Sequence, residues 1–169
     1  MRCPVRVAIA LACLFLLASC IDHDAAGQAT ARPPAGAIAA VAYAAPADPL
    51  PAGGACAVDA VAGVAADGAV VRASSSASFG GWVADARGRV PADARLVLVG
   101  GAASYALAIT AGGSRPDVAE ALGNPALGSS GFNLDADLAG VVPGRYRLSV
   151  VYPGDMPTVC ALDVTITVQ

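Results

Sequence analysis

The residues best suited to covalent chemistry in this 169-residue chain are its five cysteines, at positions 3, 13, 20, 56 and 160. A thiolate is a soft nucleophile that can form a thioether or a disulfide. The usual partners of a catalytic nucleophile are scarce, because the single histidine is His23, lysine does not occur, and the Gly-x-Ser-x-Gly motif is missing. We therefore expect sulfur chemistry, no enzymatic activity, no catalytic residues and no cofactor.

Cys20 follows a segment that is typical of protein export. Arg2 and Arg6 precede an apolar run at 7–17, which has the length of a signal-peptide core and is shorter than the roughly 20 residues that span a bilayer as a helix. The sequence Leu-Ala-Ser-Cys at 17–20 resembles the lipobox of bacterial lipoproteins. This resemblance implies cleavage after residue 19, a thioether from Cys20 to diacylglycerol, and acylation of the new amino terminus by a fatty acid such as palmitate.

Two alternatives to lipidation stay open: an ordinary cleaved signal peptide in which Cys20 is incidental, and an anchor that spans the membrane. In enterobacterial lipoproteins an Asp directly after the lipidated Cys retains the protein in the inner membrane, and Ile21 occupies that position here. The resemblance therefore implies a lipid-anchored protein of the bacterial cell envelope, facing the periplasm or the cell surface, in the outer membrane.

Cys56 and Cys160 are the pair that remains after the signal peptide is removed and Cys20 is lipidated. An even number of cysteines in an oxidising compartment favours a disulfide. It would close a loop of roughly 100 residues, to which the chain-entropy account assigns about 4.7 kcal/mol. The alternative, two free thiols or a metal pair, lacks a histidine or third cysteine, so we predict no metal site.

Composition divides the mature chain into a tether and a domain. Residues 20–53 are rich in Ala, Pro and Gly, and such a segment buries too little apolar surface to offset its ordering entropy, so we expect a disordered tether. His23 lies in it and is expected to be exposed to solvent. The predicted units are the signal peptide at 1–19, the tether at 20–53 and a folded domain at 54–169. Eight Arg against thirteen Asp and Glu in the mature chain argue against nucleic acid as a partner.

Short runs of β-forming residues, separated by Gly, Pro, Asp and Ser, predict a β-rich domain. One helix is expected at 115–123, with Asp117 as its cap, Glu120 completing a capping box and Gly123 at its end. The fold class we predict is all-β, an antiparallel immunoglobulin-like β-sandwich of seven to eight strands with one short helix. The predicted strands are 56–64, 69–73, 78–85, 95–99, 105–110, 132–138, 146–152 and 159–168.

Four short motifs carry a second resemblance: Gly-Trp-Val at 81–83, Arg-Pro-Asp-Val at 115–118, Ser-Gly-Phe at 130–132 and Gly-Arg-Tyr at 144–146, with a closing Cys160. They are similar to an immunoglobulin-like module attached to bacterial membrane glycosyltransferase-type proteins. The resemblance covers 56–169 and implies a β-sandwich. It implies no transferase activity, because the chain has no transferase catalytic region.

Few side chains of the domain are candidates for a ligand site. Trp82 could stack on a sugar or lie in the core, and Arg115 and Asp117 could contact a ligand or only close a loop. Asp135 and Asp137 share a strand face, so they are either paired carboxylates of a hydrolase or merely the charged outer side of a strand. Calcium binding there lacks the loop pattern of an EF-hand.

Three functions follow as hypotheses. A binding or accessory module for a periplasmic protein or glycan predicts an exposed apolar or aromatic patch with a polar rim. A structural envelope lipoprotein without a ligand predicts no such patch. A hydrolase that uses Asp135 or Asp137 predicts a deep cleft lined by acids.

Overall fold

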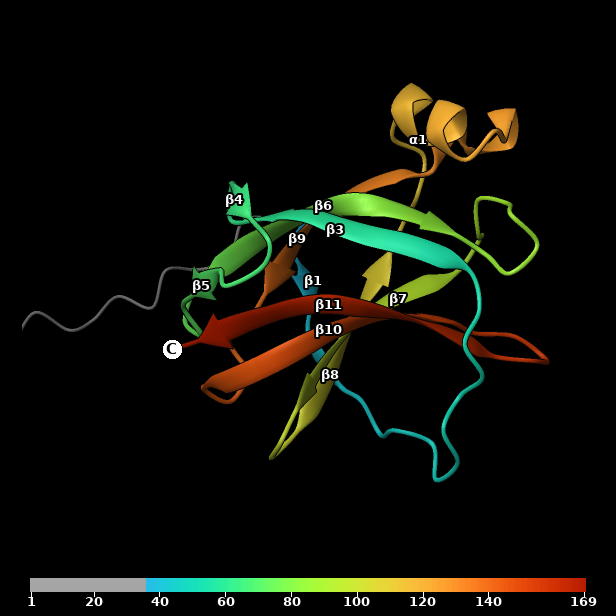
Figure 1. Ribbon diagram of the computed structural model, residues 1–169. Helices are drawn as coiled ribbons and strands as arrows, with labels where there is room; N and C mark the ends of the chain where they lie inside the picture. Colours follow the sequence, from blue (N-terminus) through green and yellow to red (C-terminus); the bar gives the residue numbers. More distant parts are fainter. Residues whose placement is uncertain (1–35) are drawn as a thin grey trace, which may run out of the picture.

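The computed structural model describes residues 36–169, which form two β-sheets and a short helical insertion (Figure 1). The insertion, between β8 and β9, consists of α1 (Pro116–Ala121) and the 3-10 helix η1 (Pro125–Ser129). The strands are β1 (Ile38–Ala39), β2 (Val41–Ala42), β3 (Ala55–Val61), β4 (Val64–Ala65), β5 (Val70–Val71), β6 (Ser76–Ala84), β7 (Ala94–Gly100), β8 (Ser104–Ile109), β9 (Gly131–Asp137), β10 (Gly144–Tyr152) and β11 (Thr158–Val168).

The two sheets are mixed. The β6 sheet has the strand order β1-β9-β6-β3-β4, and the β10 sheet has the order β2-β8-β7-β10-β11-β5. All pairs are antiparallel except β1 with β9 and β5 with β11. The expectation of purely antiparallel sheets is wrong at these two edges. Between β4 and β5 the chain crosses from the β6 sheet to the β10 sheet. After this crossover β5 runs in the same direction as β11 and pairs with it in parallel.

The core lies between the sheets and follows the period of two that a strand imposes. In β9 the residues predicted to share a face, Phe132, Leu134 and Ala136, are all buried, whereas Asn133 and Asp135 are exposed. The long strands of both sheets contribute side chains to one cluster. Its fully buried large members include Phe79, Leu96, Leu98, Leu107, Leu138, Leu148 and Ile166.

β7 carries apolar residues on both faces, as its sequence predicts. Leu96 and Leu98 lie in the core between the sheets, while Val97 belongs to a separate cluster, with Val99 packed against it. The strand lies inside its sheet, between β8 and β10. The outer face of the β10 sheet is therefore apolar at its centre and needs a cover of its own.

That cover is an N-terminal strap, residues 37–53. Its two short strands pair with different sheets, and in Figure 1 the strap then loops out below the β10 sheet before it returns to β3. The predicted disordered tether at 20–53 is therefore wrong for residues from Ile38 onwards. The reason is that Tyr43 and Leu50 pack against the outer face of the β10 sheet, which supplies the burial that the composition did not reveal. Residues 20–35, with Cys20 and His23, lie outside the described residues.

A disulfide between Cys56 of β3 and Cys160 of β11 confirms the predicted pairing. Their Cα atoms are 6.2 Å apart, and the bond joins the first long strand of the β6 sheet to the last strand of the β10 sheet. A hydrogen bond supports the same junction, because the Tyr152 hydroxyl donates to the Ala55 carbonyl at 2.9 Å. Burial raises the pKa of Tyr152 well above its ordinary value.

The helix is shorter than predicted and begins differently. Arg115 is its N-cap residue and makes no capping side-chain bond. The expected capping box with Asp117 is wrong, because the Asp117 carboxylate binds the Arg115 guanidinium. The predicted end is confirmed: Gly123 has a φ of 59° and its N–H donates to the Glu120 carbonyl at 3.0 Å, as in a glycine-terminated helix. Within 36–169, no helix is long and apolar enough to cross a bilayer.

A charged turn closes the β6–β7 connection. The Asp85 carboxylate accepts hydrogen bonds from the amides of Arg87 and Arg89, each at 2.9 Å, and pairs with the Arg89 guanidinium at 3.0 Å. Burial by itself would raise the pKa of Asp85, but these hydrogen bonds outweigh it and lower the pKa below its ordinary value.

Candidate functional site

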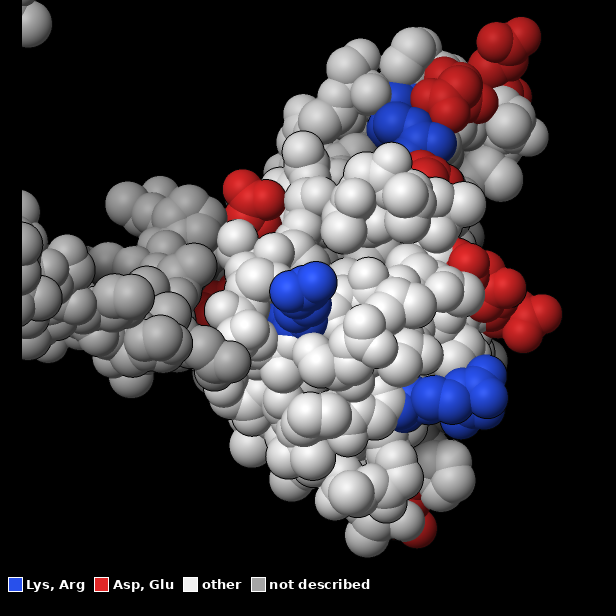
Figure 2. All heavy atoms as spheres, turned by 90° about the vertical axis from the view of Figure 1, so that its left-hand side faces the viewer, with Lys and Arg blue, Asp and Glu red and all other residues white. Residues whose placement is uncertain are grey.

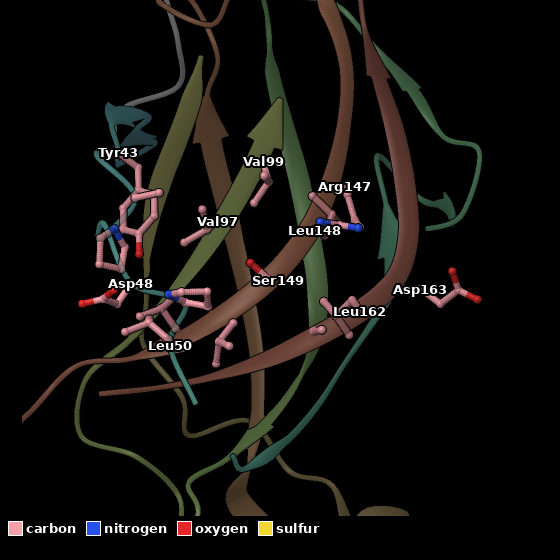
Figure 3. Close-up of a pocket in the computed structure, with 16 residues that line it drawn as sticks. Tyr43, Asp48, Leu50, Val97, Val99, Arg147, Leu148, Ser149, Leu162 and Asp163 are labelled. Atoms are coloured by element: carbon pink, nitrogen blue, oxygen red, sulfur yellow. The ribbon is translucent and has the colours of Figure 1, made fainter. Parts of the chain in front are cut away.

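A groove of about 630 Å³ lies between the N-terminal strap and the outer face of the β10 sheet (Figure 3). One wall comes from the strap and the floor comes from β7, β10 and β11. The groove is lined by Tyr43, Ala45, Pro46, Asp48, Pro49, Leu50, Val97, Val99, Arg147, Leu148, Ser149, Val151, Val159, Ala161, Leu162 and Asp163.

The floor of the groove is aliphatic because the strands alternate. Leu148 and Val150 of β10 enter the core, so Val151 belongs instead to the cluster of the outer face. Val97 of β7 and Val159 of β11 are members of the same cluster or pack against it. The floor is therefore a surface of branched methyl groups, partly covered by the strap and open along the rest of its length.

Few polar side chains reach the groove. Figure 3 shows Ser149 near the centre of the floor, while the carboxylates of Asp48 and Asp163 lie at its two sides and point away from it. Arg147 projects from β10 between Val99 and Asp163. Among the described residues, no carboxylate lies within ion-pair distance of the Arg147 guanidinium. The groove thus combines an aliphatic floor with one guanidinium that belongs to no ion pair among the described residues.

The backbone at the centre of the floor has little hydrogen-bonding capacity left. β7 is paired with β8 and β10, and β10 is paired with β7 and β11. Their N–H and C=O groups are therefore used within the sheet. A ligand on the central floor meets the hydroxyls of Ser149 and Tyr43 as nearby side-chain partners. Free backbone groups lie at the edges of the groove, because residues 44–50 of the strap make no backbone–backbone hydrogen bond and the pairing of β10 with β11 is interrupted at Leu148.

A second, shallower hollow of about 480 Å³ lies on the outer face of the β6 sheet. Gly80 opens it, because a Cβ atom at this position would meet nothing within 4 Å. Asn133, Asp59 and Arg115 stand around it. The two charged residues that line the hollow, Asp59 and Arg115, are already bonded to each other.

Arg115 ties the insertion to β3. Its guanidinium donates to the Asp59 carboxylate at 2.7 Å and to both oxygens of Asp117 at 2.8 to 3.2 Å. The hydrogen bond to Asp117 is the largest cause that raises the pKa of Arg115, and the same bond lowers the pKa of Asp117. These two predicted ligand residues therefore bind each other and Asp59.

Trp82 lies at the same end of the β6 sheet and supports the insertion. It is half-buried and packs against Ala84, Val118 and Leu127. Trp82 pairs with Gly131, and a Cβ on that glycine would come within 2.9 Å of the Arg115 Cγ. The predicted residues Trp82 and Arg115 are therefore both neighbours of Gly131, at the end of the β6 sheet where α1 and η1 pack.

The paired carboxylates lie on an open strand face. Asp135 is exposed, and the Asp137 carboxylate accepts a hydrogen bond from the Ala139 amide at 3.0 Å. Neither residue lines the groove or the second hollow. In the part of the chain that the structure describes, no group of three or more His, Cys, Asp or Glu residues is placed to hold a metal ion.

Charge is sparse on the face that Figure 2 shows. Basic and acidic side chains are scattered there over a mainly uncharged surface. This face lacks the continuous basic area that contacts a phosphate backbone.

The groove was not predicted from the sequence, although two signals for it exist. Tyr43 and Leu50 are large apolar side chains in the second half of the supposed tether, and Val97 and Val99 require a cover on the outer face of β7. Comparison with known proteins adds no assignment, since no family model, no curated protein and no solved structure matches the chain.

Proposed function

We propose that this chain is a lipid-anchored lipoprotein of the bacterial cell envelope whose β-domain is a non-catalytic binding module, with the groove as its ligand site. The observation that carries the proposal is the aliphatic floor of the groove with Arg147, Ser149, Asp48 and Asp163 around it. An exposed apolar site with a polar rim is what the binding hypothesis requires and what a purely structural lipoprotein does not need.

The position of the strap relates the groove to the proposed anchor. The strap forms one wall of the groove, and only residues 21–36 separate it from Cys20. A chain of this length reaches at most about 55 Å even when fully extended. Lipidation of Cys20 would therefore hold the groove close to the membrane surface, nearer than the full predicted tether would allow.

We further propose that the domain is immunoglobulin-like. Two features support this. First, β3 and β5, which are close in sequence, join opposite sheets, and β5 pairs in parallel with the last strand. Second, the hydroxyl of Tyr146, near the start of β10, donates to the Val142 carbonyl four residues upstream, which corresponds to the tyrosine corner of that fold. The disulfide departs from the usual inter-sheet position, because it joins the first long strand to the last.

The anchor is tested by replacing Cys20 with Ala and fractionating the cells. We expect the wild-type protein in the membrane fraction, with a diacylated N-terminal peptide in mass spectrometry, and the variant in the soluble fraction. Cys13→Ala is the matched control, since it removes a thiol from the apolar run and leaves the lipobox unchanged. Membrane retention of the Cys20→Ala protein, or an unmodified N-terminal peptide from the wild type, would contradict lipidation.

The groove is tested with an uncharged apolar dye, N-phenyl-1-naphthylamine, on the soluble Cys20→Ala protein. We expect saturable binding at one site and its loss in Ser149→Phe, which places a ring at the centre of the floor. Asn133→Phe is the control, because it adds the same ring to an exposed strand position of the other sheet. Binding that is unchanged in Ser149→Phe, or no saturable binding to the starting protein, would remove the groove as the site.

A further inference from the structure

We infer that the ligand of the groove is a single-chain aliphatic carboxylate, with its alkyl chain along the valine floor and its carboxylate at Arg147. This inference rests on the proposed function and adds the chemical class of the ligand. It is argued below from the shape of the groove, its hydrogen-bonding capacity and its charge.

The size and lining of the groove fit an alkyl chain. Its volume of about 630 Å³ lies within the range of roughly 300 to 1,000 Å³ that is usual for small-molecule sites. The floor offers branched methyl groups from Val97, Val151 and Val159, and the wall adds Leu50 and Pro49. Tyr43 is the single aromatic residue in the lining, so stacking contributes little and contact with methylene groups contributes most.

The low hydrogen-bonding capacity at the centre of the floor disfavours a peptide or a glycan in that position. Both ligands carry many donors and acceptors, and each one that is buried without a partner costs about 1 to 3 kcal/mol. At the centre of the floor the backbone of β7 and β10 is used within the sheet, and Ser149 is the polar side chain there. The free backbone groups lie at the edges, in the strap at 44–50 and beside the break in the β10–β11 pairing. An alkyl chain has no donors or acceptors, so it loses nothing by lying at the centre.

The charge at the rim selects the head group. Arg147 belongs to no ion pair among residues 36–169, and Arg145 projects from the same face of β10, two residues away. Two carboxylates also line the groove, but Figure 3 shows that those of Asp48 and Asp163 point outward. A carboxylate at the end of an alkyl chain can therefore reach the Arg147 guanidinium, which is suited to bind it in a bidentate manner.

The test is calorimetric titration of the soluble Cys20→Ala protein with three probes of equal chain length: dodecanoate, dodecanol and dodecyltrimethylammonium, each below its aggregation threshold. We expect dodecanoate to bind about two- to fivefold more tightly than dodecanol, which is the range of an exposed ion pair. The cationic probe should bind most weakly. Lengthening the carboxylate should raise affinity by about fourfold per methylene until the groove is filled.

Two variants separate the two parts of the inference. Arg147→Gln should abolish the preference for dodecanoate and leave dodecanol binding unchanged, whereas Ser149→Phe should weaken all three probes. Equal affinities for the three probes, or a preference for the cation, would refute the role of Arg147 while the groove remains a ligand site. Binding of the dye without binding of any alkyl probe would refute the aliphatic ligand alone. Failure of the dye and of all three probes would refute the proposed function itself.

Discussion

The disulfide allows the sharpest prediction about the fold. Replacing both Cys56 and Cys160 by Ala removes a bond between residues 104 positions apart. The chain-entropy account assigns about 4.7 kcal/mol to a loop of this length, and measured losses of native disulfides are typically 2 to 5 kcal/mol. Both cysteines are half-buried and pack against the core, so the lost sulfur contacts act in the same direction. We expect a loss of about 3 to 5 kcal/mol.

Such a loss is a large part of the stability of a domain, which is usually about 5 to 15 kcal/mol. For a domain of this size it corresponds to a decrease in melting temperature of roughly 10 to 15 °C. The m value for unfolding should rise as well, because the denatured chain exposes more surface once the cross-link is gone.

The assay is equilibrium unfolding in urea, followed by Trp82 fluorescence and by circular dichroism. Trp82 is the sole tryptophan and is half-buried beneath the insertion, so circular dichroism is needed to show that both sheets unfold with it. Reduction of the wild type should reproduce the double variant, and the double variant should not respond to reductant. A double variant within about 0.5 kcal/mol of the wild type would refute the reasoning, because the ring closure would then contribute almost nothing.

Three further outcomes are expected from urea unfolding. Arg115→Ala should cost about 1 to 2 kcal/mol, and a double-mutant cycle with Asp59→Asn should give a coupling of about 0.5 kcal/mol; no coupling would show that the ion pair is not formed. Tyr152→Phe should cost about 1 kcal/mol and should also reduce the loss of stability above about pH 10, because a raised folded pKa favours the neutral phenol and that contribution is lost as pH rises; an identical alkaline profile would contradict this. Asp85→Asn should reduce the loss of stability that the wild type shows below pH 3.8. The ionised Asp85 carboxylate stabilises the fold at higher pH because its pKa is lower in the folded than in the unfolded state, and this contribution disappears as acid protonates the group. An acid profile like that of the wild type would contradict this.

The strands were predictable because their signal is local. In β9, Phe132, Leu134 and Ala136 alternate with polar residues, so the sequence of this strand alone shows which of its faces is buried. The doubly apolar pattern of β7 likewise placed that strand inside a sheet. The disulfide followed from counting cysteines rather than from any knowledge of geometry.

The strap and the groove could not be predicted, because both depend on contacts between distant segments. Tyr43 and Leu50 look isolated among Ala and Pro residues until the outer face of the β10 sheet is assembled beside them. Arg115 shows the same limit. Its neighbour Asp117 suggested a helix cap, while its partner Asp59 is 56 residues away and gives no local signal.

The order of strap, disulfide and groove along the chain has a mechanical consequence. Cys56 and Cys160 enclose nearly the whole of both sheets in one covalent ring, and the strap lies upstream of that ring. A tension applied at residue 36 is resisted first by the two-residue strands β1 and β2, which can detach one after the other while the ring stays closed. Because the strap is also a wall of the groove, stretching the N-terminal segment would expose the valine floor and release a bound ligand without unfolding the domain.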